Sequence, residues 1–173
     1  MAKNSRKIIL TGYRATGKSS IGRVLARRLG VDFFDTDAML VERYGEIRDV
    51  VAAHGWPFFR AKEEALLTDL IALSEGVIAT GGGAILHEET WGKLAGTGFV
   101  VWLTASVATI CRRLAEDPVS GGQRPSLTGR AIEEEVKEVL AQREPLYRRG
   151  SDLAVPSELM VTEVTDLVMA GLH

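Results

Sequence analysis

Eight residues near the start of the chain carry the clearest chemistry in the sequence. Residues 12–19 read GYRATGKS, which fits the pattern G-x-x-x-x-G-K-[ST]. A loop of this kind wraps the phosphates of a nucleotide, because successive backbone N–H groups point inward and attract anionic oxygens. Lys18 is expected to bridge the β- and γ-phosphates, and the Ser19 hydroxyl to bind Mg²⁺. The sequence therefore predicts a site for ATP or GTP.

The residues around this loop supply the elements that it needs. Residues 7–11 form a short apolar run typical of a buried strand, and apolar side chains recur at helical spacing after Lys18. The free N–H groups and the positive dipole end of that helix would face the phosphates. Gly12 and Gly17 suit the loop because a Cβ would block the phosphates or force a strained backbone. This context favours nucleotide binding over an ordinary glycine-rich turn.

Two carboxylates and a run of glycines follow two later predicted strands. Asp35 and Asp37 end the strand predicted over residues 31–37, where the two-residue repeat of a strand would place both on one side. Capping of the next helix is the alternative role for Asp35. The glycines at residues 81–83 let the backbone approach a small ligand closely. Because open α/β sheets bind ligands at the carboxyl ends of their strands, these residues form a second candidate cluster.

Strands and helices alternate along the chain. The predicted strands cover residues 7–11, 31–37, 77–80, 99–103 and 153–155. The predicted helices cover residues 18–29, 38–44, 47–53, 59–74, 88–94, 106–116, 132–143 and a last stretch that ends near 171. This order predicts one α/β domain over residues 1–173, a three-layer sandwich in which a five-stranded parallel sheet is flanked by helices. Residues 117–130 contain prolines and glycines without apolar periodicity, which predicts a mobile loop.

Composition places the chain among ordinary globular proteins, with 46% hydrophobic and 25% charged residues. A net charge of −2 and the lack of a long basic run disfavour nucleic acid as a partner. The single cysteine, Cys111, excludes an internal disulfide and the common zinc frameworks. No apolar run approaches membrane-spanning length, and the N-terminus lacks a secretory apolar segment. We therefore expect a cytoplasmic protein with no membrane partner, and a monomer.

Beyond the phosphate loop, the chain resembles the shikimate kinases, which belong to the P-loop kinases related to nucleoside monophosphate kinases. The resemblance covers nearly the whole chain and depends on six segments in order: residues 12–19, 33–37, 55–63, 79–83, 124–125 and 143–147. It implies a P-loop NTPase sandwich with a mobile lid at about 117–130. It also implies that the helices over about 38–74 bind the phosphate acceptor.

The activity implied by the resemblance is ATP-dependent phosphorylation of the 3-hydroxyl of shikimate. Asp35 would hold Mg²⁺ through water, together with Ser19, and Asp37 would hydrogen-bond the reacting hydroxyl.

Arg60 and Arg143 would bind the shikimate carboxylate, because paired guanidinium groups suit such an anion. Glu63, one helical turn after Arg60, would fix its rotamer. Gly81, Gly82 and Gly83 would supply backbone donors, with Gly82 as the most direct contact.

The resemblance also assigns the ATP contacts, which are Gly12, Ala15, Thr16, Gly17, Lys18, Ser19, Ser20, Arg113 and Arg124. Arg124 lies in the expected lid and would place a positive charge on the transferring phosphoryl group, which makes it a catalytic residue beside Lys18 and Asp37. Arg113 resembles the arginine that stacks on adenine, although the neighbouring Arg112 leaves the register open.

Two departures from the family pattern matter. Ala15 stands where a third loop glycine is usual, so the loop must accept a Cβ, at a cost if its φ is positive. Ser126 stands where a leucine usually follows the Arg-Pro pair of the lid.

Three alternative functions stay open: a gluconate kinase, a nucleoside monophosphate kinase, or an ATP-binding module without catalysis. The paired carboxylates, the triple glycine and residues 143–147 favour shikimate as the acceptor. The intact Lys18, Asp37 and arginines disfavour an inactive module.

Overall fold

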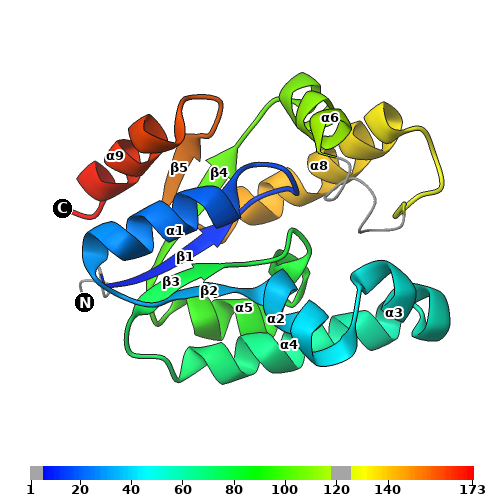
Figure 1. The fold of residues 1–173 in the computed structure, drawn as a ribbon, viewed down its shortest axis with the longest axis horizontal. Coiled ribbons are helices and arrows are strands. Elements are labelled where there is room, and N and C mark those ends of the chain that lie inside the picture. Colours follow the sequence, from blue (N-terminus) through cyan, green and yellow to red (C-terminus); the bar gives the residue numbers. More distant parts are fainter. Residues whose placement is uncertain (1–5, 118–125) are drawn as a thin grey trace.

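The computed structural model describes residues 6–117 and 126–173 (Figure 1). Its strands are β1 (Lys7–Thr11), β2 (Phe33–Asp35), β3 (Gly76–Ala79), β4 (Phe99–Thr104) and β5 (Leu153–Pro156). Its helices are α1 (Lys18–Leu29), α2 (Thr36–Tyr44), α3 (Ile47–His54), α4 (Trp56–Ile71), the 3-10 helix η1 (Ala84–Leu86), α5 (Glu88–Ala95), α6 (Val107–Glu116), α8 (Ile132–Arg149) and α9 (Val161–Gly171). No helix in these described ranges is long and apolar enough to cross a membrane.

The sheet has five parallel strands in the order β2-β3-β1-β4-β5, which confirms the predicted fold class. β1 is central, and its Leu10 pairs with Ala79 of β3. Asp35, the last residue of β2, pairs with the same Ala79. The segments that follow β1, β2 and β3 therefore leave the sheet at one edge.

The two faces of the sheet have separate cores because side chains alternate along each strand. Ile8 and Leu10 of β1 pack with Leu25 of α1 and Val164 of α9. Ile9, between them, packs on the opposite face, where residues of α4, α5 and α8 cover the sheet. Figure 1 shows α1 and α9 apart from α4 and α5, with the sheet between them. The alternation of apolar residues thus fixes which loops meet at the edge.

A third apolar cluster fixes the phosphate loop itself. Tyr13, inside the loop, is 1% exposed and packs against Ile110 of α6 and Val136 of α8. Burial raises the pKa of the Tyr13 hydroxyl. The tyrosine therefore anchors α6 and α8 beside the loop.

Lys7, the first residue of β1, is fully buried and holds the far end of α4. Its Nζ donates hydrogen bonds to the carbonyl oxygens of Leu70 (2.9 Å), Ile71 (3.1 Å) and Leu73 (2.9 Å). The last turn of α4 carries no basic residue of its own. Lys7 therefore binds carbonyls at and just beyond the C-terminus of α4, and it meets the negative end of the helix dipole. Burial lowers the pKa of Lys7.

Two predicted helices have other bounds in the structure. α2 begins at Thr36 instead of 38, because Asp35 caps the helix by accepting a hydrogen bond from the N–H of Ala38 (3.2 Å). α4 runs from Trp56 to Ile71 instead of 59 to 74, because Pro57 starts the helix in its first turn. Most of the predicted lid, residues 118–125, lies outside the described residues, so the lid stays a prediction.

Lys7→Met is expected to lower the free energy of unfolding by about 3 kcal/mol, because three carbonyls lose a charged donor while the apolar stem is kept. Chemical denaturation followed by circular dichroism measures the change. Lys93→Met is the matched control, since the Lys93 side chain is 62% exposed. Its loss should stay below about 0.5 kcal/mol. Equal losses in the two variants would contradict the role given to Lys7.

Candidate active site

The loop between β1 and α1 forms part of a pocket with a volume of about 850 Å³, which we call the first pocket. Most of the predicted ATP contacts line it: Ala15, Gly17, Lys18, Ser19, Ser20 and Arg113. Gly12 and Thr16, which also belong to the loop, are buried. A Cβ on Gly12 would come within 2.5 Å of the carbonyl oxygen of Leu103, so the loop can pack on β4 only with a glycine there.

The backbone of the loop is strained at Ala15. Among the described residues it is the one non-glycine with a left-handed φ, at +61°. This conformation costs an alanine about 1 kcal/mol. The expected penalty at the position of the missing third glycine is therefore present, and strain of this kind is typical of functional loops.

Lys18 folds over the loop that precedes it. Its Nζ donates hydrogen bonds to the carbonyl oxygens of Gly12 (2.8 Å) and Tyr13 (2.7 Å). Lys18 is also the first residue of α1, whose N-cap is Gly17. The ammonium and the helix N-terminus together make this part of the pocket electropositive, which suits a phosphate.

Ser19 and Asp35 meet at the other side of the loop. The Ser19 hydroxyl donates a hydrogen bond of 2.5 Å to Oδ2 of Asp35, while Oδ1 caps α2. The capping role that the sequence offered for Asp35 is therefore confirmed, and its other oxygen faces the Ser19 hydroxyl. Hydroxyl and carboxylate oxygens are suitable ligands for Mg²⁺. The described ranges contain no group of three His, Cys, Asp or Glu side chains that could hold a metal.

Asp37 lies in the first turn of α2 and lines the first pocket together with Asp35. The argument that strand alternation places both carboxylates on one side is wrong, because β2 ends at Asp35. The start of a helix brings them to the same pocket instead. Between them, the buried Thr36 accepts a hydrogen bond from the N–H of Gly81 (3.0 Å) and ties α2 to the end of β3.

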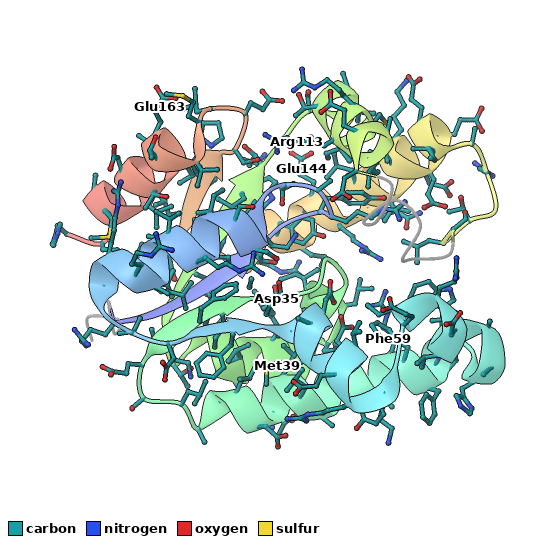
Figure 2. All side chains as sticks on the ribbon, viewed as in Figure 1. Asp35, Met39, Phe59, Arg113, Glu144 and Glu163 are labelled. Carbon is teal, nitrogen blue, oxygen red and sulfur yellow. The ribbon has the colours of Figure 1, made fainter. Side chains whose placement is uncertain are left out.

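Arg113 faces the first pocket, whereas Arg112 is exposed. Its guanidinium donates hydrogen bonds to the carbonyl oxygens of Ser157 (2.6 Å) and Ala15 (3.2 Å). Figure 2 shows Arg113 and Asp35 on opposite sides of the phosphate loop. The uncertainty between the two neighbouring arginines is thus resolved in favour of Arg113 as the pocket residue.

Glu158, next to Ser157, reinforces the N-terminal cap of α6, whose N-cap residue is Ser106. Its Oε1 accepts a hydrogen bond from the backbone N–H of Ser106 (2.9 Å). This bond, with those from the side chains of Thr109 and Ser106, lowers the pKa of Glu158 to about 2. The loop beside Arg113 is therefore fixed to α6 by an ionised carboxylate.

A second, much smaller pocket, with a volume of about 10 Å³, adjoins the first. It is lined by Tyr13, Arg14, Trp56, Arg60, Gly82, Leu127 and Arg143. Arg14 and Gly82 line both pockets, so the two spaces share a wall. Arg60 and Arg143, which the sequence assigned to one anion, line the second pocket together as expected.

A buried carboxylate fixes Arg60. Its Nη1 lies 2.7 Å from Oε2 of Glu63, whose side chain is fully buried. The same oxygen lies 3.0 Å from Nε2 of His87. The predicted contact between Arg60 and Glu63 is confirmed, and His87 adds a second partner that the sequence did not suggest.

The three glycines after β3 have different roles. Gly83 gives Arg60 room, since a Cβ there would lie 2.0 Å from its Nη1. Gly82 lines both pockets. This position is required by the prediction that Gly82 makes the most direct contact with the acceptor. Gly81 faces Thr36 through its N–H.

Two residues of the site escaped sequence reasoning, and one predicted residue is not seen. Arg14 lines both pockets, and its place inside the loop motif was the available signal. His87 gave no signal, because its partner Glu63 lies 24 residues away in the sequence. Arg124 lies outside the described residues, so its assignment stays a prediction.

The parallel sheet, with the phosphate loop between its central strand and α1, defines a P-loop kinase. A family model described as "Shikimate kinase" matches residues 14–172. The chain belongs to the shikimate kinase family.

Curated relatives agree with this assignment. The chain is 44% identical to a shikimate kinase of Syntrophus aciditrophicus, over 96% of this chain and 90% of the relative. It is 43% identical to a shikimate kinase of Nitratidesulfovibrio vulgaris, over 96% and 95%.

Solved structures show the same fold. The shikimate kinase of Acinetobacter baumannii in complex with shikimate superposes with a TM-score of 0.85 at 29% identity, over 97% of this chain and 91% of that one. A gluconokinase of Sinorhizobium meliloti reaches a TM-score of 0.55 at 19% identity, over 98% and 93%, which shows the fold alone.

Glu158→Gln is expected to lower the melting temperature at pH 7, by a margin that shrinks in acid. A carboxyl whose folded pKa is depressed stabilises the protein above its unfolded pKa, near 4.5, and this contribution is lost as the pH falls toward about 2. Scanning calorimetry of both proteins from about pH 7 to about pH 3 measures the margin. Glu116→Gln, an exposed position on α6, is the control. A margin that stays constant over this range would contradict the capping role.

Proposed function

We infer that this chain is a shikimate kinase, which transfers the γ-phosphoryl group of ATP to the 3-hydroxyl of shikimate and gives shikimate 3-phosphate and ADP. The observation that carries this inference is the shared wall of the two pockets. One pocket contains the phosphate loop, and the other contains three arginines. A triphosphate and a small carboxylate-bearing acceptor would therefore meet at Arg14 and Gly82. Membership of the family and the likeness to an enzyme solved with shikimate support the same acceptor.

On the nucleotide side, we propose that Lys18 bridges the β- and γ-phosphates and that Arg113 borders the adenine beside Ser157. Ser19 and Asp35 would hold Mg²⁺, which neutralises phosphate charge when it is bound. Arg124 would add a positive charge from the lid. The hydrogen bonds from the Lys18 ammonium to the loop carbonyls of Gly12 and Tyr13 support this role.

On the acceptor side, Arg60 and Arg143 would bind the shikimate carboxylate, with Gly82 at the wall between acceptor and nucleotide. Asp37 would accept a hydrogen bond from the 3-hydroxyl and align this oxygen with the γ-phosphorus. As the new O–P bond forms and the bond to ADP breaks, the hydroxyl proton passes to the Asp37 carboxylate. Pre-set charges around a water-poor site supply most of the stabilisation of such a transition state.

The alternatives have less support. A gluconate kinase shares the fold at only 19% identity, whereas the curated shikimate kinases are 43–44% identical to this chain. A nucleoside monophosphate kinase needs a base-binding element, and the sequence shows none. An inactive ATP-binding module does not account for Arg60 of the second pocket being held by the buried carboxylate of Glu63.

A coupled assay of ADP release tests the assignment with shikimate, gluconate and nucleoside monophosphates as acceptors. We expect turnover with shikimate and at least about a hundredfold lower kcat/KM with the others. Asp37→Asn, measured in parallel, should lose turnover and thereby exclude a contaminating kinase. Turnover with gluconate or a nucleotide, and none with shikimate, would overturn the proposed function.

Gly83→Ala is expected to raise the KM for shikimate at least about tenfold, because its Cβ would displace the Arg60 guanidinium. The KM for ATP should change less than about twofold, since the phosphate loop is untouched. Gly92→Ala is the matched control, because a Cβ at Gly92 has no atom within 4 Å. An unchanged shikimate KM in Gly83→Ala would show that Arg60 does not bind the acceptor in this position.

A further inference from the structure

Glu135, in the first turn of α8, is a buried carboxylate to which the proposed reaction gives no role. Its side chain is 2% exposed. Oε1 accepts a hydrogen bond of 2.9 Å from Nη2 of Arg14 in the phosphate loop. Oε2 accepts hydrogen bonds from the backbone N–H groups of Leu127 (2.9 Å) and Thr128 (3.1 Å). One side chain therefore joins the phosphate loop, α8 and the segment that precedes α8.

The segment held by Glu135 is a closed turn. The hydroxyls of Ser126 and Thr128 donate hydrogen bonds to Oε2 of Glu135. Ser126 Oγ also accepts a hydrogen bond from the N–H of Gly129 (2.7 Å). A leucine at position 126 could make neither of these bonds. The departure of Ser126 from the family pattern thus has a structural reason in this chain.

Both partners of Glu135 belong to the second pocket. Arg14 and Leu127 line it together with Arg60 and Arg143. Arg14 also lines the first pocket, so its guanidinium lies where the two pockets meet. The position of this charge is set by Glu135, since their ion pair is nearly buried, with side-chain exposures of 16% and 2%.

The carboxylate is suited to act as a permanent counter-charge. Burial by itself raises the pKa of Glu135, but the hydrogen bonds from Ser126, Thr128 and Leu127 and the charge of Arg14 outweigh it and lower the pKa overall. Glu135 therefore stays ionised at neutral pH. A neutral side chain of the same shape would leave Arg14 without its buried partner.

We propose that Glu135 is a positioning residue for acceptor binding. It fixes Arg14 and Leu127 as two walls of the second pocket, and so sets the acceptor beside the phosphate loop. The proposal depends on the proposed function, because it takes the second pocket as the acceptor site. Glu135 itself lies behind Arg14 and acts through it.

The test compares Glu135→Gln with Glu134→Gln, a neighbouring exposed acid on the same helix. Glutamine keeps the size of the side chain, but its single carbonyl oxygen cannot serve both Arg14 and the turn. We expect Glu135→Gln to raise the KM for shikimate about tenfold, with the KM for ATP changed less than about twofold. Glu134→Gln should leave both values unchanged. Steady-state kinetics in the coupled assay measures them, and thermal melts verify that each variant is folded.

A double-mutant cycle with Arg14→Gln separates positioning from general stability. Because Glu135 acts mainly through Arg14, adding Glu135→Gln to Arg14→Gln should raise the shikimate KM less than about threefold further. If Glu135→Gln does not fold, Arg14→Gln alone tests the same contact, since it leaves the turn bonds intact. It should then give the same selective rise in the shikimate KM.

Two results would overturn the proposal. One is a shikimate KM that changes less than about twofold in Glu135→Gln or in Arg14→Gln. The other is an equal rise in the KM values for ATP and shikimate, which is the result expected for a purely structural residue. Failure of the proposed function is distinct, because the unmodified chain would then show no shikimate-dependent release of ADP.

Discussion

The site depends on the parallel pairing of β3 with both of its neighbours, β1 and β2. The register aligns Leu10 of β1 and Asp35 of β2 with the same residue of β3, Ala79, so the three strands end together. The phosphate loop, the acidic pair and the glycine run therefore meet at one edge of the sheet. A shift of one residue in β1 would also turn Ile9 toward the wrong core. The same strand pairing therefore directs the apolar side chains into their cores and aligns the residues of the site.

Within this frame, two of the three arginines of the second pocket are held by carboxylates before any ligand arrives. Arg60 pairs with Glu63 and Arg14 pairs with Glu135, and both carboxylates are almost completely buried. Such pairs add little to stability, because removing the charges from water costs about as much as their attraction returns. Their benefit is geometric. A guanidinium with a fixed rotamer binds a planar anion with less loss of side-chain entropy.

The sequence predicted the fold and the phosphate loop, because each depends on local periodicity or on a known motif. The grouping of Arg60 with Arg143 was implied by the resemblance to the shikimate kinases. The side-by-side placement of Asp35 and Asp37 was right, but its reason was wrong: a strand repeat was assumed where a helix begins at Thr36. Contacts between distant segments, such as His87 with Glu63, leave no local pattern and could not be found.

Lys7 attaches the carboxyl end of α4 to the start of β1. Lys7 clamps the carboxyl end of this helix, while Arg60 projects from near its other end, roughly 16 Å away at 1.5 Å per residue. Because α4 also packs in the core along its length, Arg60 stands on a rigid support. The packing at the opposite edge of the sheet therefore also sets the position of Arg60 at the second pocket.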